Sequence, residues 1–254
     1  MADPACFPRR GTCTSCSSFY HLNKLQKKKS KRYRQSAKLV GAKKDYTLTE
    51  AIRLLKQFPP TKFDQTVVLS FHLDVDPERS DHMVRGACLL PNGSGRSVRI
   101  LVFATGEEAV KAKEAGAEYV GYEDLLQKVS AGFFGFDVII ATPAAMIGVR
   151  KLGKILGPRG LMPNLKTGTV TENAAAAVRE VKSGRVEFKL DRNANVAVPI
   201  GKLSFFEDAL AENGGAVIRT LLRARPVAAK SSFVKSLTIS ATMSPGVGIE
   251  SSFI

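Results

Sequence analysis

The sequence predicts an α/β protein of two domains, in which a split α+β domain carries an inserted small parallel-sheet α/β domain. Strands with alternating apolar and polar residues, which are typical of antiparallel sheets, occur before residue 92 and again after residue 184. Between them, short Val- and Ile-rich strands alternate with helices, as expected for a parallel sheet with helical crossovers. The chain has 254 residues, of which 44% are hydrophobic, and this is enough for two packed cores.

The first part of the split domain spans 31–92 and follows a basic extension, 1–30, that is expected to be disordered. A helix is predicted over 47–58, because Thr47 or Thr49 can cap it, Glu50 lies three residues after Thr47 as in a capping box, and apolar residues follow at helical spacing. Two prolines end this helix. Strands are predicted next, over 67–75 and 84–90.

The inserted domain spans 93–183 and begins beside a cluster of Pro, Asn, Gly and Ser that breaks regular structure. Strand 137–142 is rich in Val and Ile, which fits the centre of a sheet covered on both faces. A Gly- and Pro-rich loop is expected over 153–169. The other predicted elements are strands 98–103 and 118–121, helices 107–116 and 123–130, a helix that begins at Pro143, and a helix over 172–182.

The second part of the split domain spans 184–254. Strands are predicted over 186–190 and 196–200, and residues 193–195 are suited to close them into a hairpin. Helix 205–225 contains two interior glycines, each of which costs about 1 kcal/mol relative to Ala. The last predicted strand has Leu237, Ile239, Ala241 and Met243 on one face and Ser236, Thr238, Ser240 and Thr242 on the other.

The positive charge is concentrated in two segments. The net charge is +15; residues 1–44 hold 12 Lys and Arg against one acid, and residues 150–192 hold 10 against four. Clustered cations favour a polyanion, because each phosphate that they neutralise releases counterions. A nucleic acid is therefore the expected partner, with a solvated tail or an anionic membrane surface as alternatives. No apolar run is long enough to span a bilayer, so no membrane insertion is expected.

No enzyme signature is complete. The glycines at 93–95 precede a strand, whereas a dinucleotide-binding loop follows one. Residues 160–167 approach a phosphate-binding loop, but Leu165 stands where its second Gly is needed. Cys13 and Cys16 have the spacing of metal ligands, yet they lie in the extension without a second pair. We therefore expect no catalytic residues, no metal site and no cofactor.

Several short stretches, distributed over 31–249, are more specific. The most specific is GPRGLMPN at 157–164. The others include KRYR at 31–34, KFD at 62–64, VRG at 84–86, KTGTV at 166–170, GRVEF at 184–188, VPIGK at 198–202 and TMSPG at 242–246. In order and spacing they resemble the ribosomal protein L-one family, the large-subunit stalk protein, in its bacterial or organellar type. The sequence departs from that pattern at Leu165 and Ser244, where Pro and Gly are usual, and residues 1–25 have no counterpart.

The resemblance implies a structural constituent of the large ribosomal subunit with two α/β domains, the first split around the second. It implies binding to ribosomal RNA of the mobile stalk, help in releasing exit-site transfer RNA, and repression of the protein's own messenger RNA in translation. It implies no catalysis. The RNA-binding residues that it implies are Lys31, Arg32, Arg34, Lys62, Phe63, Arg185, Glu187, Lys189, Ser236, Thr242, Met243 and Ser244, with Arg159 and Lys166 as secondary contacts.

Other interpretations remain open at this point. Phe63, Phe188 and Met243 are core residues in a purely structural interpretation, which the alternation favours for Phe188. Glu187 then pairs with a neighbouring cation on its own strand. The chain as a whole is alternatively a nucleotide-dependent enzyme that uses the inserted α/β domain, or a free translational repressor. The expected location is the ribosome in the cytoplasm, with an organellar ribosome as the alternative.

Overall fold

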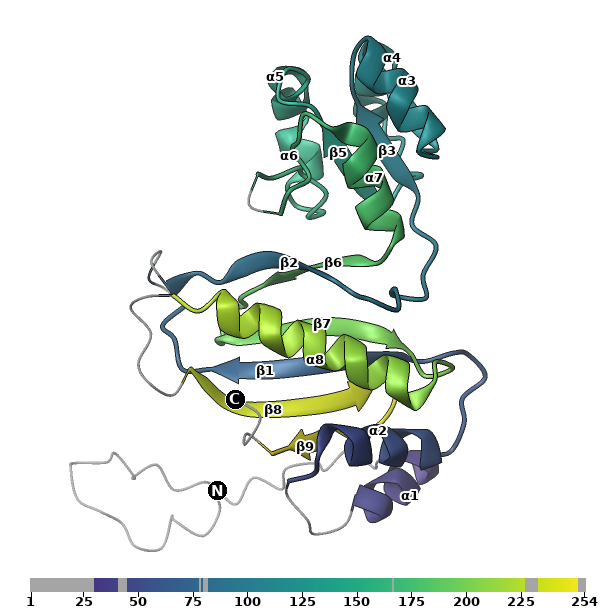
Figure 1. Ribbon diagram of the computed structural model, residues 1–254, viewed down its shortest axis with the longest axis vertical. Helices are drawn as coiled ribbons and strands as arrows, with labels where there is room; N and C mark the ends of the chain where they lie inside the picture. The colour runs from purple at the N-terminus through teal and green to yellow at the C-terminus, as the bar shows by residue number, and fades with distance from the viewer. Residues whose placement is uncertain are drawn as a thin grey trace, which may run out of the picture.

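The computed structural model describes residues 30–40, 45–77, 79, 82–165, 167–226 and 233–250. The chain forms an antiparallel sheet with helices packed on one face and, separately, a smaller parallel sheet, which confirms the predicted fold class (Figure 1). Except for Ser30, the predicted basic extension lies outside the described residues, and so do Cys13 and Cys16.

The larger sheet has four strands in the order β7-β1-β8-β9, with antiparallel neighbours throughout. Its strands are β1 (Thr66–Leu73), β7 (Asn195–Lys202), β8 (Val234–Ala241) and β9 (Val247–Ile249). Every second residue of β1, from Val67 to Leu73, is buried, as the alternation predicts. Two helices, α2 (Leu48–Gln57) and α8 (Glu207–Arg223), pack on each other and against this sheet. The main core therefore lies between the helices and one face of the sheet.

Local sequence explains both helices. The Thr47 hydroxyl accepts from the Glu50 N–H, and the Glu50 carboxylate accepts from the Thr47 N–H, so the predicted capping box is present at the start of α2. In α8, Gly214 faces α2, where a Cβ would lie 3.3 Å from a methyl carbon of Leu48. A glycine at this interior position therefore allows the two helices to approach closely.

The smaller sheet has three parallel strands in the order β4-β3-β5. They are β3 (Ile100–Phe103), β4 (Tyr119–Gly121) and β5 (Val138–Ala141). Ile100 and Val102 share one apolar cluster with α3 (Glu107–Glu114) and α7 (Ala174–Lys182). Leu101 and Phe103 share another with α4 (Glu123–Ser130), α5 (Met146–Lys151) and α6 (Gly153–Leu156). Both faces are covered because successive strand side chains point in opposite directions, as predicted for an apolar parallel strand.

A two-stranded antiparallel ladder lies between the two sheets (Figure 1). It pairs β2 (Arg85–Leu89) with β6 (Arg185–Lys189). Just beyond this ladder, Gly184 has a φ of +105° and a Cβ there would lie 2.5 Å from the Cα of Gly93. The two segments that lead to and from the smaller sheet therefore touch through glycine backbone.

Some local predictions are wrong. A tight turn joins β6 to β7, with the Asp191 N–H donating to the Asn195 carbonyl at 2.8 Å, but the predicted hairpin ladder is replaced by pairing of β6 with β2 and of β7 with β1. The last predicted strand ends at Ala241, so Met243 leaves the core face. The sequence patterns also do not indicate α1 (Lys31–Val40), whose one buried residue is Ser36, or α6 and β9.

Candidate nucleic-acid interface

The turn after β8 contains Thr242, Met243 and Ser244, and it is tied to the segment at the start of β1. The Thr242 N–H donates to the carbonyl of Thr66 at 3.1 Å, and the Thr242 hydroxyl accepts from the Thr66 N–H at 3.1 Å. The Ser244 N–H donates to the Ala241 carbonyl at 3.0 Å, and its hydroxyl accepts from the Ala241 N–H at 2.9 Å. These two hydroxyls therefore hold the turn in place.

Met243 is held by its backbone while its side chain is exposed. Its N–H donates to Oε1 of Gln65 at 3.1 Å, and its carbonyl accepts from Nη2 of Arg32 at 3.4 Å. Gln65 is 4% exposed, whereas Met243 is 53% exposed. The interpretation of Met243 as a core residue is therefore wrong, and its thioether is available to a partner.

The segments that meet at this turn carry several cations and one exposed aromatic side chain. Lys62 and Phe63, both exposed, lie shortly before Gln65 in the chain. Arg32 brings the basic helix α1 to the same place through its bond to the Met243 carbonyl. Predicted residues from three segments thus converge at one end of the larger sheet: Lys31, Arg32 and Arg34 on α1, Lys62 and Phe63 before β1, and Thr242, Met243 and Ser244 after β8. We call this surface the turn face.

Lys202 is a cation of this region that sequence reasoning missed. Its Nζ donates to the Thr66 hydroxyl at 2.9 Å, and Thr66 is the residue that holds Thr242. Lys202 lies at the end of β7, opposite Thr66 in the β1–β7 register. The motif at 198–202 does not indicate that its Lys lies beside Thr66, because this contact depends on the pairing of β1 with β7.

Three other predicted residues are not part of the turn face itself. Ser236 is near the start of β8, six residues from Thr242, which is about 20 Å along an extended strand. Glu187 and Lys189 are on β6, in the two-stranded ladder, and Glu187 lines a cleft together with Thr66 and Lys202. Glu187 lies 4.0 Å from Arg85 across that ladder, so its predicted pairing with a cation of its own strand is wrong. Phe188 is buried at 3% exposure, which confirms the core interpretation.

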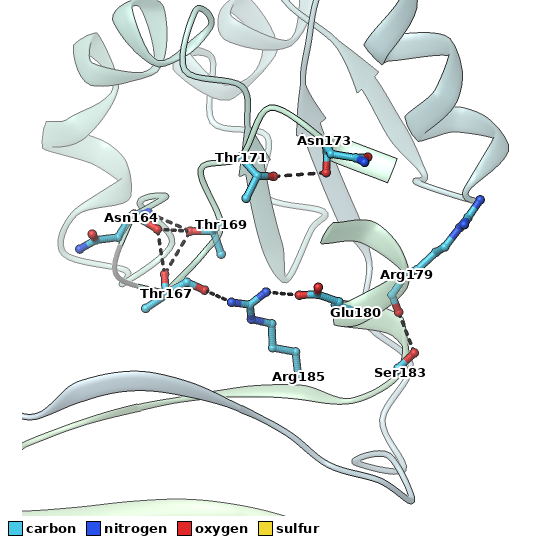
Figure 2. Close-up of polar contacts among 9 residues, drawn as sticks. All are labelled: Asn164, Thr167, Thr169, Thr171, Asn173, Arg179, Glu180, Ser183 and Arg185. Atoms are coloured by element: carbon cyan, nitrogen blue, oxygen red, sulfur yellow. Dashed lines mark hydrogen bonds and ion pairs between the residues drawn. The ribbon is translucent and has the colours of Figure 1, made fainter. Parts of the chain in front are cut away.

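The Arg185 guanidinium is occupied by groups of the segment 93–183 (Figure 2). Its Nη1 pairs with the carboxylate of Glu180 on α7, and its Nη2 donates to the carbonyl of Thr167 at 2.7 Å. The side chain is 19% exposed. This cation therefore lies in an internal contact between β6 and the loop before α7, and little of its charge faces solvent.

The loop that receives Arg185 is closed by its own hydrogen bonds (Figure 2). The Asn164 N–H donates to the Thr169 hydroxyl at 2.8 Å, and the Thr167 hydroxyl donates to the Asn164 carbonyl at 3.2 Å. Thr167 is 1% exposed and Thr169 is 5% exposed. Gly168 between them has a φ of +65°, and a Cβ there would lie 2.3 Å from Nη2 of Arg185. The loop that approaches a phosphate-binding motif in sequence thus binds a guanidinium instead.

Of the two predicted secondary RNA contacts, Arg159 lies within the described residues and Lys166 does not. The guanidinium of Arg159 lies 3.4 Å from the ring centroid of Phe134, in a cation–π contact between two loops beside the smaller sheet. Arg159 itself is exposed, so one side of its charge still faces solvent.

A cleft of about 440 Å³ separates the larger sheet from the smaller one, with lining residues that include Thr66, Arg96 and Lys202. Asp137, at its edge, accepts from Arg99 Nε at 3.2 Å and from Arg96 Nη2 at 3.3 Å. The side-chain hydrogen bond from Arg99 is the main reason why the pKa of Asp137 is lowered from its ordinary value of 3.8. The carboxylate therefore neutralises part of the positive charge at this cleft.

Neither a metal centre nor a membrane span is found in the described part of the chain. Among those residues, no three His, Cys, Asp or Glu side chains gather as metal ligands do. No described helix has the length and apolar character needed to cross a bilayer.

Comparisons with known proteins agree with the resemblance seen in the sequence. The profile of the "Ribosomal protein L1p/L10e family" matches residues 55–245. The "Large ribosomal subunit protein uL1" of Protochlamydia amoebophila (strain UWE25) is 52% identical over 221 residues, which cover 87% of this chain and 94% of that protein. The protein of the same name from Phytoplasma australiense is 49% identical over 223 residues, covering 88% of this chain and 97% of its own length. The chain therefore belongs to the ribosomal protein L1p/L10e family.

Proposed function

We propose that this protein is a structural component of the large ribosomal subunit that binds ribosomal RNA of the stalk through the turn face. The two relatives, both named as large ribosomal subunit proteins, support the ribosomal role. The observation that carries the RNA site is the convergence of α1, the segment before β1 and the turn after β8 around an exposed Met243. In this proposal residues 31–92 and 184–254 form the split RNA-binding domain, and residues 93–183 form the inserted domain.

The chemistry of the turn face suits folded RNA. Protein groups recognise RNA helices across a shallow minor groove through phosphates and 2′-hydroxyls, and unpaired bases through stacking. Arg32, Lys62 and Lys31 supply positive charge, while Phe63 and Met243, at 50% and 53% exposure, supply apolar contact area. Because the turn is already fixed by hydrogen bonds, little ordering is needed when RNA binds.

The residues away from the turn face have narrower proposed roles. Ser236 and Lys189 would contact RNA only if it extends beyond the turn. Glu187 would do so only if RNA enters the cleft that it lines with Thr66 and Lys202. Arg185 serves mainly as an internal contact. Release of exit-site transfer RNA and repression of the protein's own messenger RNA are further parts of this proposal, and both would use the same RNA-binding chemistry. The proposed location is the ribosome in the cytoplasm, with an organellar ribosome as the alternative.

The test is filter binding of the full chain to a transcript of the large-subunit stalk segment, with a scrambled transcript as competitor. Met243→Ala is expected to weaken specific binding about tenfold, which corresponds to about 1.4 kcal/mol. Met83→Ala is a matched control, because Met83 is 52% exposed but lies before β2, on another part of the surface. Equal binding by wild type and Met243→Ala would move the RNA site elsewhere. Sedimentation of the protein away from large subunits in extract would instead favour a free repressor.

A further inference from the structure

We infer that Gln65 is a positioning residue of the turn face: its buried side chain holds the Met243 amide and thereby sets where the Met243 side chain meets RNA. This inference rests on the proposed RNA site. Gln65 lies between the motif residues Lys62 and Phe63 and the first strand, and neither composition nor the resemblance assigns it a role.

The hydrogen bonds of the turn single out Gln65. The Thr242 N–H is taken by the backbone carbonyl of Thr66, and the Ser244 N–H by the carbonyl of Ala241. The Met243 N–H is the one of the three that donates to a side chain, at 3.1 Å to Oε1 of Gln65. A change at Gln65 therefore frees the residue whose side chain is exposed and leaves the bonds of its two neighbours in place.

Gln65 is a firm support because its own backbone is fixed on both sides. Its carbonyl accepts from the Leu203 N–H at 2.8 Å. The preceding carboxylate, Asp64, accepts from the Ser204 hydroxyl at 2.7 Å, and the following residue, Thr66, is paired with Thr242. With the side chain 4% exposed as well, the acceptor oxygen has one stable position.

The second support of Met243 is weaker. Arg32 Nη2 reaches the Met243 carbonyl at 3.4 Å, which is long for a hydrogen bond, and the contact is exposed to solvent. Water readily replaces such a bond, so Arg32 alone would leave the Met243 backbone free to turn. A flexible, unbranched Met side chain would then have to be ordered by RNA during binding, and this ordering lowers affinity.

Two substitutions separate the acceptor from the bulk of the side chain. Gln65→Met keeps the length and volume but has no oxygen acceptor, whereas Gln65→Glu keeps an oxygen acceptor at the same place. Gln127→Met is the control for the chemical change, because Gln127 is exposed on α4. Binding to the stalk-segment transcript is measured over a series of salt concentrations, so that the added charge of Gln65→Glu is seen as a change in salt slope.

We expect Gln65→Met to weaken specific binding about fivefold with an unchanged salt slope, since no charge is lost. Gln65→Glu is expected to recover most of that loss once the salt slope is taken into account, and Gln127→Met to bind as wild type does. Wild-type affinity for Gln65→Met, in an assay where Met243→Ala does weaken binding, would overturn the inference. An equal loss for Gln65→Met and Gln65→Glu at high salt would also overturn it, because the acceptor would then not be the reason.

A measurement without RNA separates this inference from the proposed function. Hydrogen exchange of the Met243 amide, followed by NMR, is expected to be about tenfold faster in Gln65→Met than in wild type, while amides in β1 and β8 keep their protection. Faster exchange with unchanged RNA binding in both Gln65→Met and Met243→Ala would refute the RNA site and leave the positioning contact standing. Unchanged exchange would refute the positioning role itself.

Discussion

Arg185→Met should destabilise the protein, although the family resemblance implies that Arg185 binds RNA. The substitution deletes a hydrogen bond to the Thr167 carbonyl, which belongs to a residue of 1% exposure, and an ion pair with Glu180. A hydrogen bond that involves a charged group contributes about 1.5–3 kcal/mol. The Glu180 side chain is 52% exposed, so water compensates for most of the lost pair and it adds at most about 1 kcal/mol. The expected loss is about 2 kcal/mol in the free energy of unfolding.

Equilibrium urea unfolding followed by far-UV circular dichroism measures this loss, because the chain has no Trp for fluorescence. Arg179→Met is the matched control: Arg179 is an exposed cation on α7 that points away from the loop in Figure 2. The control should change the free energy of unfolding by less than about 0.5 kcal/mol. If Arg185→Met unfolds at the same urea concentration as wild type, the guanidinium does not stabilise this contact and the reasoning fails.

Gly168→Ala supplies a second, independent check of the same contact. Its φ of +65° strains any side chain, and its Cβ would lie 2.3 Å from Nη2 of Arg185. In the Arg185→Met background the backbone strain remains but the clash with the guanidinium is gone. The two substitutions should therefore couple by about 0.5 kcal/mol or more in a double-mutant cycle. Simple additivity would show that Arg185 does not lie against Gly168.

Three further predictions concern the turn face, the extension and the cleft. Thr242→Val leaves the Thr66 N–H without its acceptor, so it should weaken binding to the stalk transcript by more than about 1 kcal/mol in a filter assay; unchanged affinity would move the site. Deletion of residues 1–30, which hold six Lys and Arg, should reduce the salt slope of binding and preserve specificity; loss of specificity would contradict this. Asp137→Asn should lower the free energy of unfolding by about 1 kcal/mol at pH 7. The pKa of Asp137 is lower in the folded than in the unfolded state, so the loss of unfolding free energy in Asp137→Asn should be complete at pH values above the unfolded pKa. It should disappear as the pH falls through the folded pKa, and a loss that stays constant in acid would contradict this.

Sequence reasoning worked where a local signal determines the structure. The capping box at Thr47 and Glu50 marks α2, the alternation from Val67 to Leu73 marks β1, and the apolar strand before Pro143 marks β5. In each case the pattern lies within a few residues of the element that it predicts; burial alternates along β1 and is continuous along most of β5, as their patterns indicate. The family could be recognised for a similar reason, because its motifs are continuous stretches of the chain.

The candidate site was predicted only in part, because it depends on contacts between distant segments. The segments that carry Lys62, Phe63 and Met243 do meet, but they are linked through Gln65, which is 178 positions from Met243 in sequence. No pattern in the chain indicates which side chain will accept from a given amide across such a separation. Lys202 was missed for the same reason, since it reaches the turn face only through the pairing of β7 with β1.

The amino-acid sequence alone determined most of the order of helices and strands, the family, and the excess of positive charge, since each of these follows from residues close together in the chain. The tertiary structure alone decided which cations face outward. Arg32 lies on the turn face, whereas Arg185, chemically identical, is held inside by Glu180 and Thr167. The physical reason is that a guanidinium binds whatever acceptors the fold brings within about 3 Å, and those acceptors come from segments that only folding brings together.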